Sequence, residues 1–381
     1  MKITERLKGL KKSTWALIIL FLLCGVLLVL SRLFPAFCEW YAENIFPLWL
    51  NSFGRLTSLV PFSFGEALIV LGIVIVLLTL PAMAVLLIKF KGRAKQQRRV
   101  LKVISLFYLW VLCYVTVTET LNCFVLYRCP TFGEIYDIPA EEHTNAELLD
   151  LCGYLTDNCN SLAPRMQRDE EGLFVLTTDL DETAKRAMNA LGEEFPRLEG
   201  FYVTPKAVKN SFFMSQQYLM GIYFPFTLEA NYNREMYPSN LPETVCHELA
   251  HTRGFMLEDE ANFIAFLACT RCEDTEYQYS GYLRALKYVL SQVRDNCTDD
   301  EINGVYAALC PEVLTDINGN ASYWQSVQES DEGLLPSETV ADIGDKAMEA
   351  SLKMNGVEDG KRSYGRMVDL LLNYGVGYDE G

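Results

Sequence analysis

Residues 242–262 read Pro-Glu-Thr-Val-Cys-His-Glu-Leu-Ala-His-Thr-Arg-Gly-Phe-Met-Leu-Glu-Asp-Glu-Ala-Asn. This stretch holds two of the three histidines of the 381-residue chain, His247 and His251, which enclose Glu248 in a His-Glu-x-x-His motif. On a helix, residues four apart lie on one face, so both imidazoles can bind one metal ion. Glu248 directly follows the first histidine and can accept a proton from water at the metal. The motif predicts a catalytic Zn²⁺ site with Glu248 as the general base.

A catalytic zinc site needs a third protein ligand and an open position for water. Gly254 is a natural end for the motif helix, and the next helix is expected to begin almost at once, at Glu258. Glu258 is the expected third ligand, and Glu260 is the alternative. Asn262 follows Glu258 by four residues, so its amide can hold a ligating imidazole from the second layer of contacts.

The sequence on either side of this stretch predicts an α+β fold for residues 129–381. Short β-rich segments come first, and the expected strands span residues 200–203, 211–214 and 221–226. Helices dominate afterwards, and those expected span residues 242–253, 258–272, 279–293, 299–309, 338–354 and 363–374. Two helices are expected before the sheet, one at residues 181–195 and one that opens with a capping box of Thr144 and Glu147.

Three long apolar runs all lie before residue 128, at about 15–33, 67–88 and 103–126. Each run is close to the roughly 20 residues that a helix needs to cross the hydrocarbon of a bilayer. Residues 1–128 are therefore expected to form a membrane domain with three transmembrane helices. Residues 129–381 are expected to form a separate domain.

Basic residues predict the orientation of these helices, because basic flanks stay in the cytoplasm. They precede the first run and fill the second connection, at Lys2, Arg6, Lys8, Lys11, Lys12, Lys89, Lys91, Arg93, Lys95, Arg98, Arg99 and Lys102. The first connection, residues 34–66, has only Arg55 and is rich in aromatic residues, which suit contact with membrane lipid. The amino terminus is thus expected in the cytoplasm of a multi-pass membrane protein, and the carboxyl-terminal domain outside it.

Charge divides the chain at the same boundary. Residues 1–128 contain 15 Lys/Arg and five Asp/Glu, whereas residues 129–381 contain 18 and 44. A surface this acidic repels phosphate backbones, so nucleic acid is excluded as a partner. Ten of the twelve cysteines fall in or beside the parts expected outside the cytoplasm, where disulfides are permitted, although sequence does not assign their pairing.

The motif and the helix after it resemble the gluzincin metallopeptidases, whose third ligand is a glutamate. Glu258 and Asn262 occupy the positions that match the third-ligand helix of that family. The spacer from His251 to Glu258 is much shorter than in thermolysin-like gluzincins, and Asn262 stands in place of the usual aspartate. The resemblance covers about residues 242–266 and implies a zincin-like domain.

In a zincin-like fold, an edge strand of the sheet runs along the cleft and pairs with an extended substrate. Gly221, Ile222, Tyr223 and Phe224 precede the motif helix and form the candidate strand. Most of the chain also resembles an uncharacterised bacterial family of three-span membrane proteins, known only as a domain of unknown function. Segments such as residues 221–227, Gly-Ile-Tyr-Phe-Pro-Phe-Thr, contribute to that resemblance.

The expected function is zinc-dependent hydrolysis of peptide bonds in peptides or envelope proteins, outside the cytoplasm. The alternative is a zinc-stabilised envelope scaffold or receptor that catalyses no hydrolysis. The two differ in whether Glu248 is needed for function. The natural substrate and the oligomeric state are not specified by the sequence.

Overall fold

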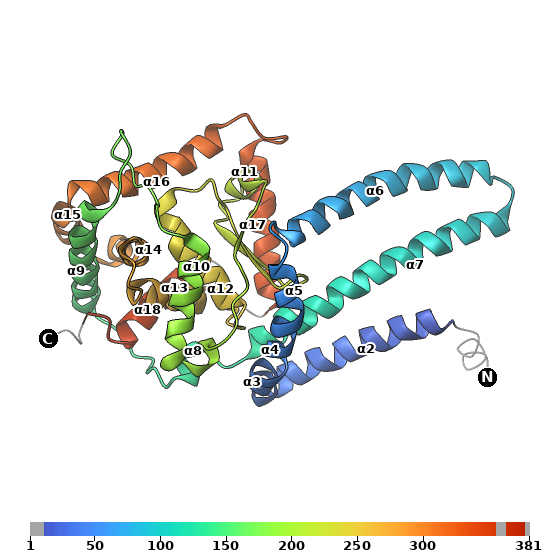
Figure 1. Ribbon diagram of the computed structural model, residues 1–381, viewed down its shortest axis with the longest axis horizontal. Helices are drawn as coiled ribbons and strands as arrows, with labels where there is room; N and C mark the ends of the chain where they lie inside the picture. The colour runs from blue at the N-terminus through green and yellow to red at the C-terminus, as the bar shows by residue number, and fades with distance from the viewer. Residues whose placement is uncertain (1–10, 356–362, 378–381) are drawn as a thin grey trace.

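The computed structural model describes residues 11–355 and 363–377, and three long helices project from one side of a mostly helical domain (Figure 1). These are α2 (Lys12–Leu33), α6 (Phe64–Lys89) and α7 (Ala94–Glu119). Helix α7 continues through the π-helical turn η2 (Thr120–Phe124) and the 3₁₀ turn η3 (Leu126–Arg128) to the domain. All three are long and apolar enough to cross a membrane, as the sequence predicts.

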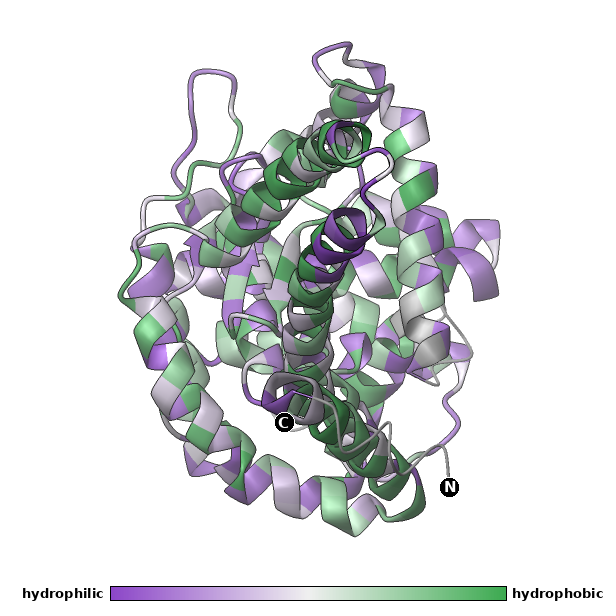
Figure 2. Cartoon of the chain, turned by 90° about the vertical axis from the view of Figure 1, so that its right-hand side faces the viewer, coloured by the Kyte–Doolittle hydropathy of each residue, from purple (hydrophilic) through white to green (hydrophobic). Residues whose placement is uncertain are grey.

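Hydrophobic residues make up most of the projecting helices, and hydrophilic residues gather at the α6–α7 connection (Figure 2). Along α6, only Gly65 is buried by the protein itself. An apolar surface of this length needs an apolar environment, which a bilayer provides. Helix α7 begins nine residues before the predicted apolar run, because its Lys, Arg and Gln residues are also good helix formers. The predicted cations Lys2, Arg6 and Lys8 lie outside the described residues.

Short helices connect the first two long helices and lie between them and the domain (Figure 1). They are α3 (Pro35–Asn44), α4 (Phe46–Trp49), the π-helical turn η1 (Leu50–Gly54) and α5 (Arg55–Ser58). Exposed apolar side chains lie on these helices and on the connection from α5 to α6, namely Trp40, Leu48, Trp49, Leu56, Leu59 and Phe62. This composition suits a position at the level of lipid headgroups.

One small mixed sheet lies in the domain, in the order β1-β3-β2. Its strands are β1 (Lys206–Ala207), β2 (Gly221–Phe224) and β3 (Glu229–Tyr232), with β1 parallel and β2 antiparallel to β3. Strand β2 ends before Pro225, which cannot donate to a ladder. The α+β prediction holds in a coarser form, as a mostly helical domain with one small sheet.

Two predicted strands are wrong. Residues 211–214 belong to the short helix α11 (Ser211–Ser215), because the Glu66 carboxylate accepts the N–H groups of Lys209 and Asn210 at 2.8 and 2.9 Å and turns the chain there. This contact comes from a residue more than 140 positions away and overrides the local strand preference. Residues 200–203 form no regular element, and Tyr202 packs into the core instead of pairing with a strand.

The predicted helices of the domain are all present, with ends that differ by a few residues. The helices are α8 (Phe132–Ile135), α9 (Asn145–Leu162), α10 (Leu180–Ala190), α12 (Leu241–His251), α13 (Glu258–Thr270), α14 (Thr275–Asn296), α15 (Asp299–Ala308), α16 (Pro311–Glu329), α17 (Ser337–Met354) and α18 (Ser363–Asn373). Short 3₁₀ turns are η4 (Ala163–Arg165), η5 (Leu191–Glu193), η6 (Pro196–Leu198) and η7 (Pro238–Asn240). The capping box of Thr144 and Glu147 is formed, whereas α8 and α16 were not predicted.

Helices α12, α13 and α14 form the centre of the core, and α13 is buried along nearly its whole length. A second, smaller cluster joins the domain to the ends of the long helices. It combines Tyr41, Phe46 and Leu126 with Leu228 and Met256. All twelve cysteines are free thiols, and seven of them are buried.

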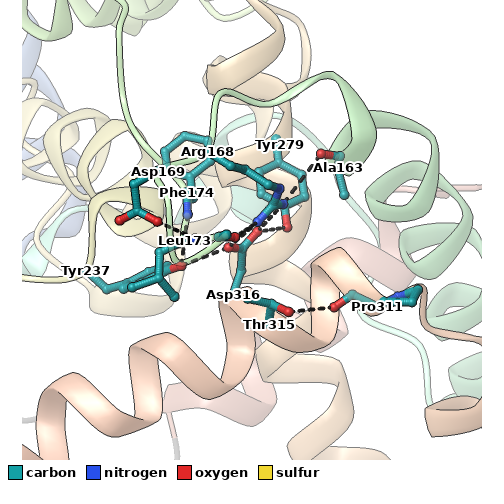
Figure 3. Close-up of polar contacts among 11 residues, drawn as sticks. Ala163, Arg168, Asp169, Leu173, Phe174, Tyr237, Tyr279, Pro311, Thr315 and Asp316 are labelled. Atoms are coloured by element: carbon teal, nitrogen blue, oxygen red, sulfur yellow. Dashed lines mark hydrogen bonds and ion pairs between the residues drawn. The ribbon is translucent and has the colours of Figure 1, made fainter.

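Asp316 of the unpredicted helix α16 is fully buried and holds that helix against the core (Figure 3). Its two carboxylate oxygens accept from the Arg168 guanidinium at 3.0 and 2.9 Å. Its oxygens also accept from the hydroxyls of Tyr237 at 2.8 Å and Tyr279 at 2.5 Å. Four donors therefore satisfy one buried charge, which explains why an acidic residue occupies this position.

We expect Asp316→Ala to lower the free energy of unfolding by about 3–5 kcal/mol, because it leaves the Arg168 charge and two buried hydroxyls without their acceptor. The measurement is denaturant unfolding of the full chain in detergent, followed by tryptophan fluorescence. Asn318→Ala, at an exposed position of the same helix, should change this free energy by less than about 0.5 kcal/mol. Equal effects of the two substitutions would show that the Asp316 network does not stabilise the fold.

Candidate metal centre

The site forms where helix α12 ends and helix α13 begins. Pro242 stands at the start of α12, where its missing N–H costs no hydrogen bond, and the helix ends at His251. Gly254 has a φ of +87°, a conformation that side chains other than glycine rarely adopt. Arg197 donates to the Gly254 carbonyl at 2.9 Å and secures this turn. The turn brings the first residue of α13, Glu258, back to the last turn of α12.

Three predicted ligands come together there. The Nε2 atoms of His247 and His251 lie 3.1 Å apart. The Glu258 carboxylate lies 3.2 Å from Nε2 of His247 and 3.8 Å from Nε2 of His251. All three ligand atoms lie within 4.8 Å of one another, in a group that could hold a metal ion.

The other ring nitrogens establish the tautomers of both histidines. Nδ1 of His247 lies 2.8 Å from Oδ1 of Asn262, and Nδ1 of His251 lies 2.7 Å from the carbonyl oxygen of Phe255. Each oxygen is an acceptor, so each Nδ1 carries the proton. In the neutral rings both Nε2 atoms therefore present lone pairs, and these point at each other. Asn262 occupies the supporting position that its spacing predicts.

The charges of the three groups are strongly coupled. Burial opposes protonation of His247, but the hydrogen bond to Glu258 and the Glu258 charge outweigh it and raise the pKa of His247 to about 9. Burial and the charge of His247 lower the pKa of His251 to about 4. Burial works against ionisation of Glu258, yet the hydrogen bond and charge of His247 lower its pKa to about 2. These pKa shifts favour an ion pair of protonated His247 and ionised Glu258 beside a neutral His251. The Glu258 side chain is 45% exposed, so solvent weakens this pairing.

A divalent ion with nitrogen and oxygen ligands fits this arrangement. Tetrahedral ligands at about 2.05 Å from Zn²⁺ lie about 3.3 Å from one another, close to the separations found here. Two imidazoles and one carboxylate also form one of the ligand sets known from catalytic zinc sites. His247, His251 and Glu258 are the residues that would hold the ion.

Glu248 lies beside the cluster with an incomplete set of partners. Its side chain is buried, and its Oε2 atom has no hydrogen-bond partner. Burial raises its pKa to about 8; the charge of His247 opposes the rise, and the charges of Glu258 and Glu243 add to it. The other oxygen, Oε1, lies against the backbone of Gly221, where an added Cβ would approach it to 2.3 Å. The glycine at the start of β2 therefore makes room for this carboxylate.

Glu260, the alternative third ligand, is turned away from the histidines. Its carboxylate accepts the Phe132 N–H at 2.6 Å from helix α8, and its side chain is buried there. Burial raises the pKa of Glu260 to about 8. The structure therefore brings Glu258, and not Glu260, to the two imidazoles.

The candidate substrate strand β2 lies at an edge of the sheet, beside α12. The Asn233 N–H donates to the Met220 carbonyl at 2.8 Å. Hydrogen-bonded pairs alternate along antiparallel strands, so the backbone N–H and C=O groups of Gly221 and Tyr223 face away from β3. Open backbone groups thus lie next to Glu248.

Sequence reasoning missed the contacts between this strand and the third long helix. The Asn122 side chain donates to the Pro225 carbonyl at 2.8 Å, and the Tyr114 hydroxyl donates to the carbonyl of Phe226. The Tyr223 hydroxyl donates to the Asn122 carbonyl at 3.2 Å. The only signal in the sequence is a polar asparagine at the end of an apolar run.

The protein thus combines three helices that are long and apolar enough to cross a membrane with a mostly helical domain that carries a His-His-Glu cluster. Residues 41–372 match the model of a family described as "Protein of unknown function (DUF3810)", and the chain belongs to this family. The predicted resemblance to an uncharacterised three-span family is confirmed. No curated protein and no solved structure matches the chain.

We expect the purified full chain to bind one Zn²⁺ ion, and Asn262→Ala to weaken the affinity by about 10–100-fold, because the His247 ring loses the partner that orients it. Competition with a chromophoric chelator measures this affinity. Asn318→Ala, far along the chain on α16, is the control and should bind as the unaltered protein does. Undiminished affinity in His247→Ala and His251→Ala would contradict the site itself.

Proposed function

We propose that this protein is a membrane-anchored zinc metallopeptidase that hydrolyses peptide bonds outside the cytoplasm. The observation that carries the proposal is the convergence of two imidazole lone pairs and one carboxylate beside Glu248, a buried carboxylate with an unpartnered oxygen. Structural histidines in a core satisfy both ring nitrogens with hydrogen bonds. Here the two inward nitrogens have only each other and Glu258, which favours a cation between them.

Bound Zn²⁺ would supply Lewis-acid activation of a water molecule and of the substrate carbonyl. Glu248 would take the proton from that water and later pass it to the leaving amine. Its raised pKa suits the second step, because the protonated carboxyl group can hold the proton until it passes to the amine. The charge of a bound Zn²⁺ would lower the pKa of Glu248 and favour the carboxylate form that takes the proton from water. Asn262 and the Phe255 carbonyl would hold the two histidine rings in place.

A zincin-like arrangement is part of the proposal. The motif helix α12 packs beside a sheet whose edge strand β2 runs antiparallel to its neighbour. An extended peptide could add to the open backbone groups of Gly221 and Tyr223, and its scissile bond would then pass Glu248. The acidic partner for a metal comes from the following helix, as in the gluzincin pattern.

The distribution of basic residues supports the proposed orientation. The α6–α7 connection and the start of α2 lie at the same end of the long helices, remote from the domain (Figure 1). Those ends carry Lys11, Lys12 and the cations between Lys89 and Lys102. Basic flanks stay in the cytoplasm, so the domain would lie on the other side of the membrane.

Glu248→Gln tests the function. We expect it to lower kcat/KM for peptide hydrolysis by about 10²–10⁴-fold, because glutamine cannot accept the proton, while zinc content stays at one ion per chain. Cleavage of a broad peptide library by the full chain in detergent, followed by mass spectrometry, gives the activity. The control is Glu199→Gln, an exposed glutamate.

Two other outcomes would decide against the proposal. If the unaltered protein binds zinc and cleaves no peptide, and Glu248→Gln supports the same cellular function, the chain is a zinc-stabilised scaffold or receptor. If the protein cleaves peptides and Glu248→Gln cleaves them equally well, the hydrolysis does not occur at this site.

Gly221→Ala is expected to lower kcat at least tenfold with zinc binding retained, because its Cβ would lie 2.3 Å from Oε1 and 2.6 Å from Cγ of Glu248 and would push that side chain aside. The same assay measures it. Gly153→Ala is the matched control, since an added Cβ there meets no atom within 4 Å. Full activity in Gly221→Ala would mean that Glu248 does not act from its present position.

A further inference from the structure

The third long helix sets the height of the site above a membrane. Lys102 is the last cation before its apolar run. A hydrocarbon core of about 30 Å is crossed by about 20 helical residues at 1.5 Å each, so the boundary on the domain side falls near Asn122. Asn122 lies in η2, and it binds the β2–β3 hairpin together with Tyr114 of α7.

One side chain connects this boundary to a metal ligand. The Tyr223 hydroxyl donates to the Asn122 carbonyl, and the Tyr223 ring lies 6.2 Å from the His251 ring, centroid to centroid. The turn after α12 also packs against η3, because a Cβ on Gly254 would lie 3.3 Å from the side chain of Leu126, four residues beyond Asn122. The path from the His251 ring through Tyr223 to the Asn122 carbonyl is the sum of 6.2 Å between the rings, about 2.8 Å from ring centre to hydroxyl and 3.2 Å for the hydrogen bond. The His251 ring therefore lies within about 12 Å of the residue at the hydrocarbon boundary.

Contacts of the other strands with the connection between the first two long helices and with α6 also fix the distance of the site from the membrane. The Glu229 carboxylate of β3 accepts the N–H groups of Phe64 and Gly65, the first residues of α6, at 3.0 and 2.6 Å. The Lys206 ammonium of β1 completes this buried contact at 2.5 Å from Glu229 and also donates to the Thr57 carbonyl. Strand β3 therefore holds α6, strand β1 holds α5, and the β2–β3 hairpin holds α7.

Exposed apolar side chains also lie where the long helices meet the domain. The α3–α5 segment contributes those described above, Trp40 and Trp49 among them. Helix α11, which follows the residues held by Glu66 of α6, adds Phe213, and the turn after α11 adds Tyr218; these side chains are 48% and 52% exposed. Aromatic and apolar groups around the ends of membrane helices are typical of contact with lipid headgroups.

We infer that the substrate is a polypeptide that is itself anchored in the membrane, and that it is cut within the first few residues outside the bilayer. The inference rests on the proposed function and names the substrate class of that site. An extended chain covers about 3.3 Å per residue, so a site at this height meets residues roughly three to eight past the end of an anchor. A cut further out would require the chain to fold back toward the lipid surface.

The experiment uses the full chain in phosphatidylethanolamine–phosphatidylglycerol vesicles with zinc. The probe is a peptide library with a leucine–alanine membrane helix of about 20 residues, followed directly by a randomised segment. A second library places about 20 Gly/Ser residues between the helix and the same segment. Both libraries are present at equal surface density, so they differ only in the distance of the randomised segment from the bilayer. A third library lacks the membrane helix and is soluble. The Glu248→Gln variant gives the background rate of cleavage that does not depend on this site.

We expect the library without a spacer to be cleaved at least tenfold faster than the one with it, at positions within about eight residues of the helix. Equal or faster cleavage of the spaced or the soluble library, with dependence on Glu248, would overturn the inference and leave the peptidase proposal intact. No Glu248-dependent cleavage of any library would overturn the proposed function itself.

Discussion

Two imidazole nitrogens that face each other at 3.1 Å with a carboxylate beside them impose the main constraint on this structure. Lone pairs in a buried place repel one another unless a positive charge lies between them. A proton on His247 can supply that charge, and a divalent cation would supply it with better geometry for all three groups. Three nearby residues position this cluster. Gly254 adopts a left-handed backbone conformation that turns the chain back toward α12, and the Asn262 amide orients the His247 ring. Gly221 has no side chain and so leaves room for the Glu248 carboxylate.

Contacts elsewhere in the domain fix the position of these groups relative to the long helices. Asp316 fixes α16 against the core through Arg168 and two tyrosines (Figure 3). Glu229 and Lys206 join the sheet to α6, and Asn122 joins its hairpin to α7. The site therefore belongs to the junction between the two parts of the molecule, and its distance from a membrane is a property of the fold rather than of a linker.

Much of the candidate site could be predicted because its residues are close in sequence. A spacing of four on one helix puts His247 and His251 on the same face, and Gly254 with Glu258 sets the return of the chain. Local sequence also predicted the three apolar helices, since each had to supply its own hydrophobic length. It could not choose between Glu258 and Glu260, because that choice depends on the distant Phe132 N–H that binds Glu260. The wrong strand at residues 211–214 and the missed helix α16 have the same kind of origin, a contact with a residue far along the chain. Glu66 turns the chain before residue 211, and Arg168 binds Asp316 of α16.

X-ray absorption at the zinc edge of the full chain, purified in detergent with one equivalent of Zn²⁺, tests the central claim most directly. The account predicts two imidazole nitrogens and one carboxylate oxygen, with one further light atom, all at about 2.0–2.2 Å. His251→Ala should remove one imidazole from the first shell. A first shell that contains sulfur, or one without imidazole that is unchanged in His251→Ala, would contradict the account.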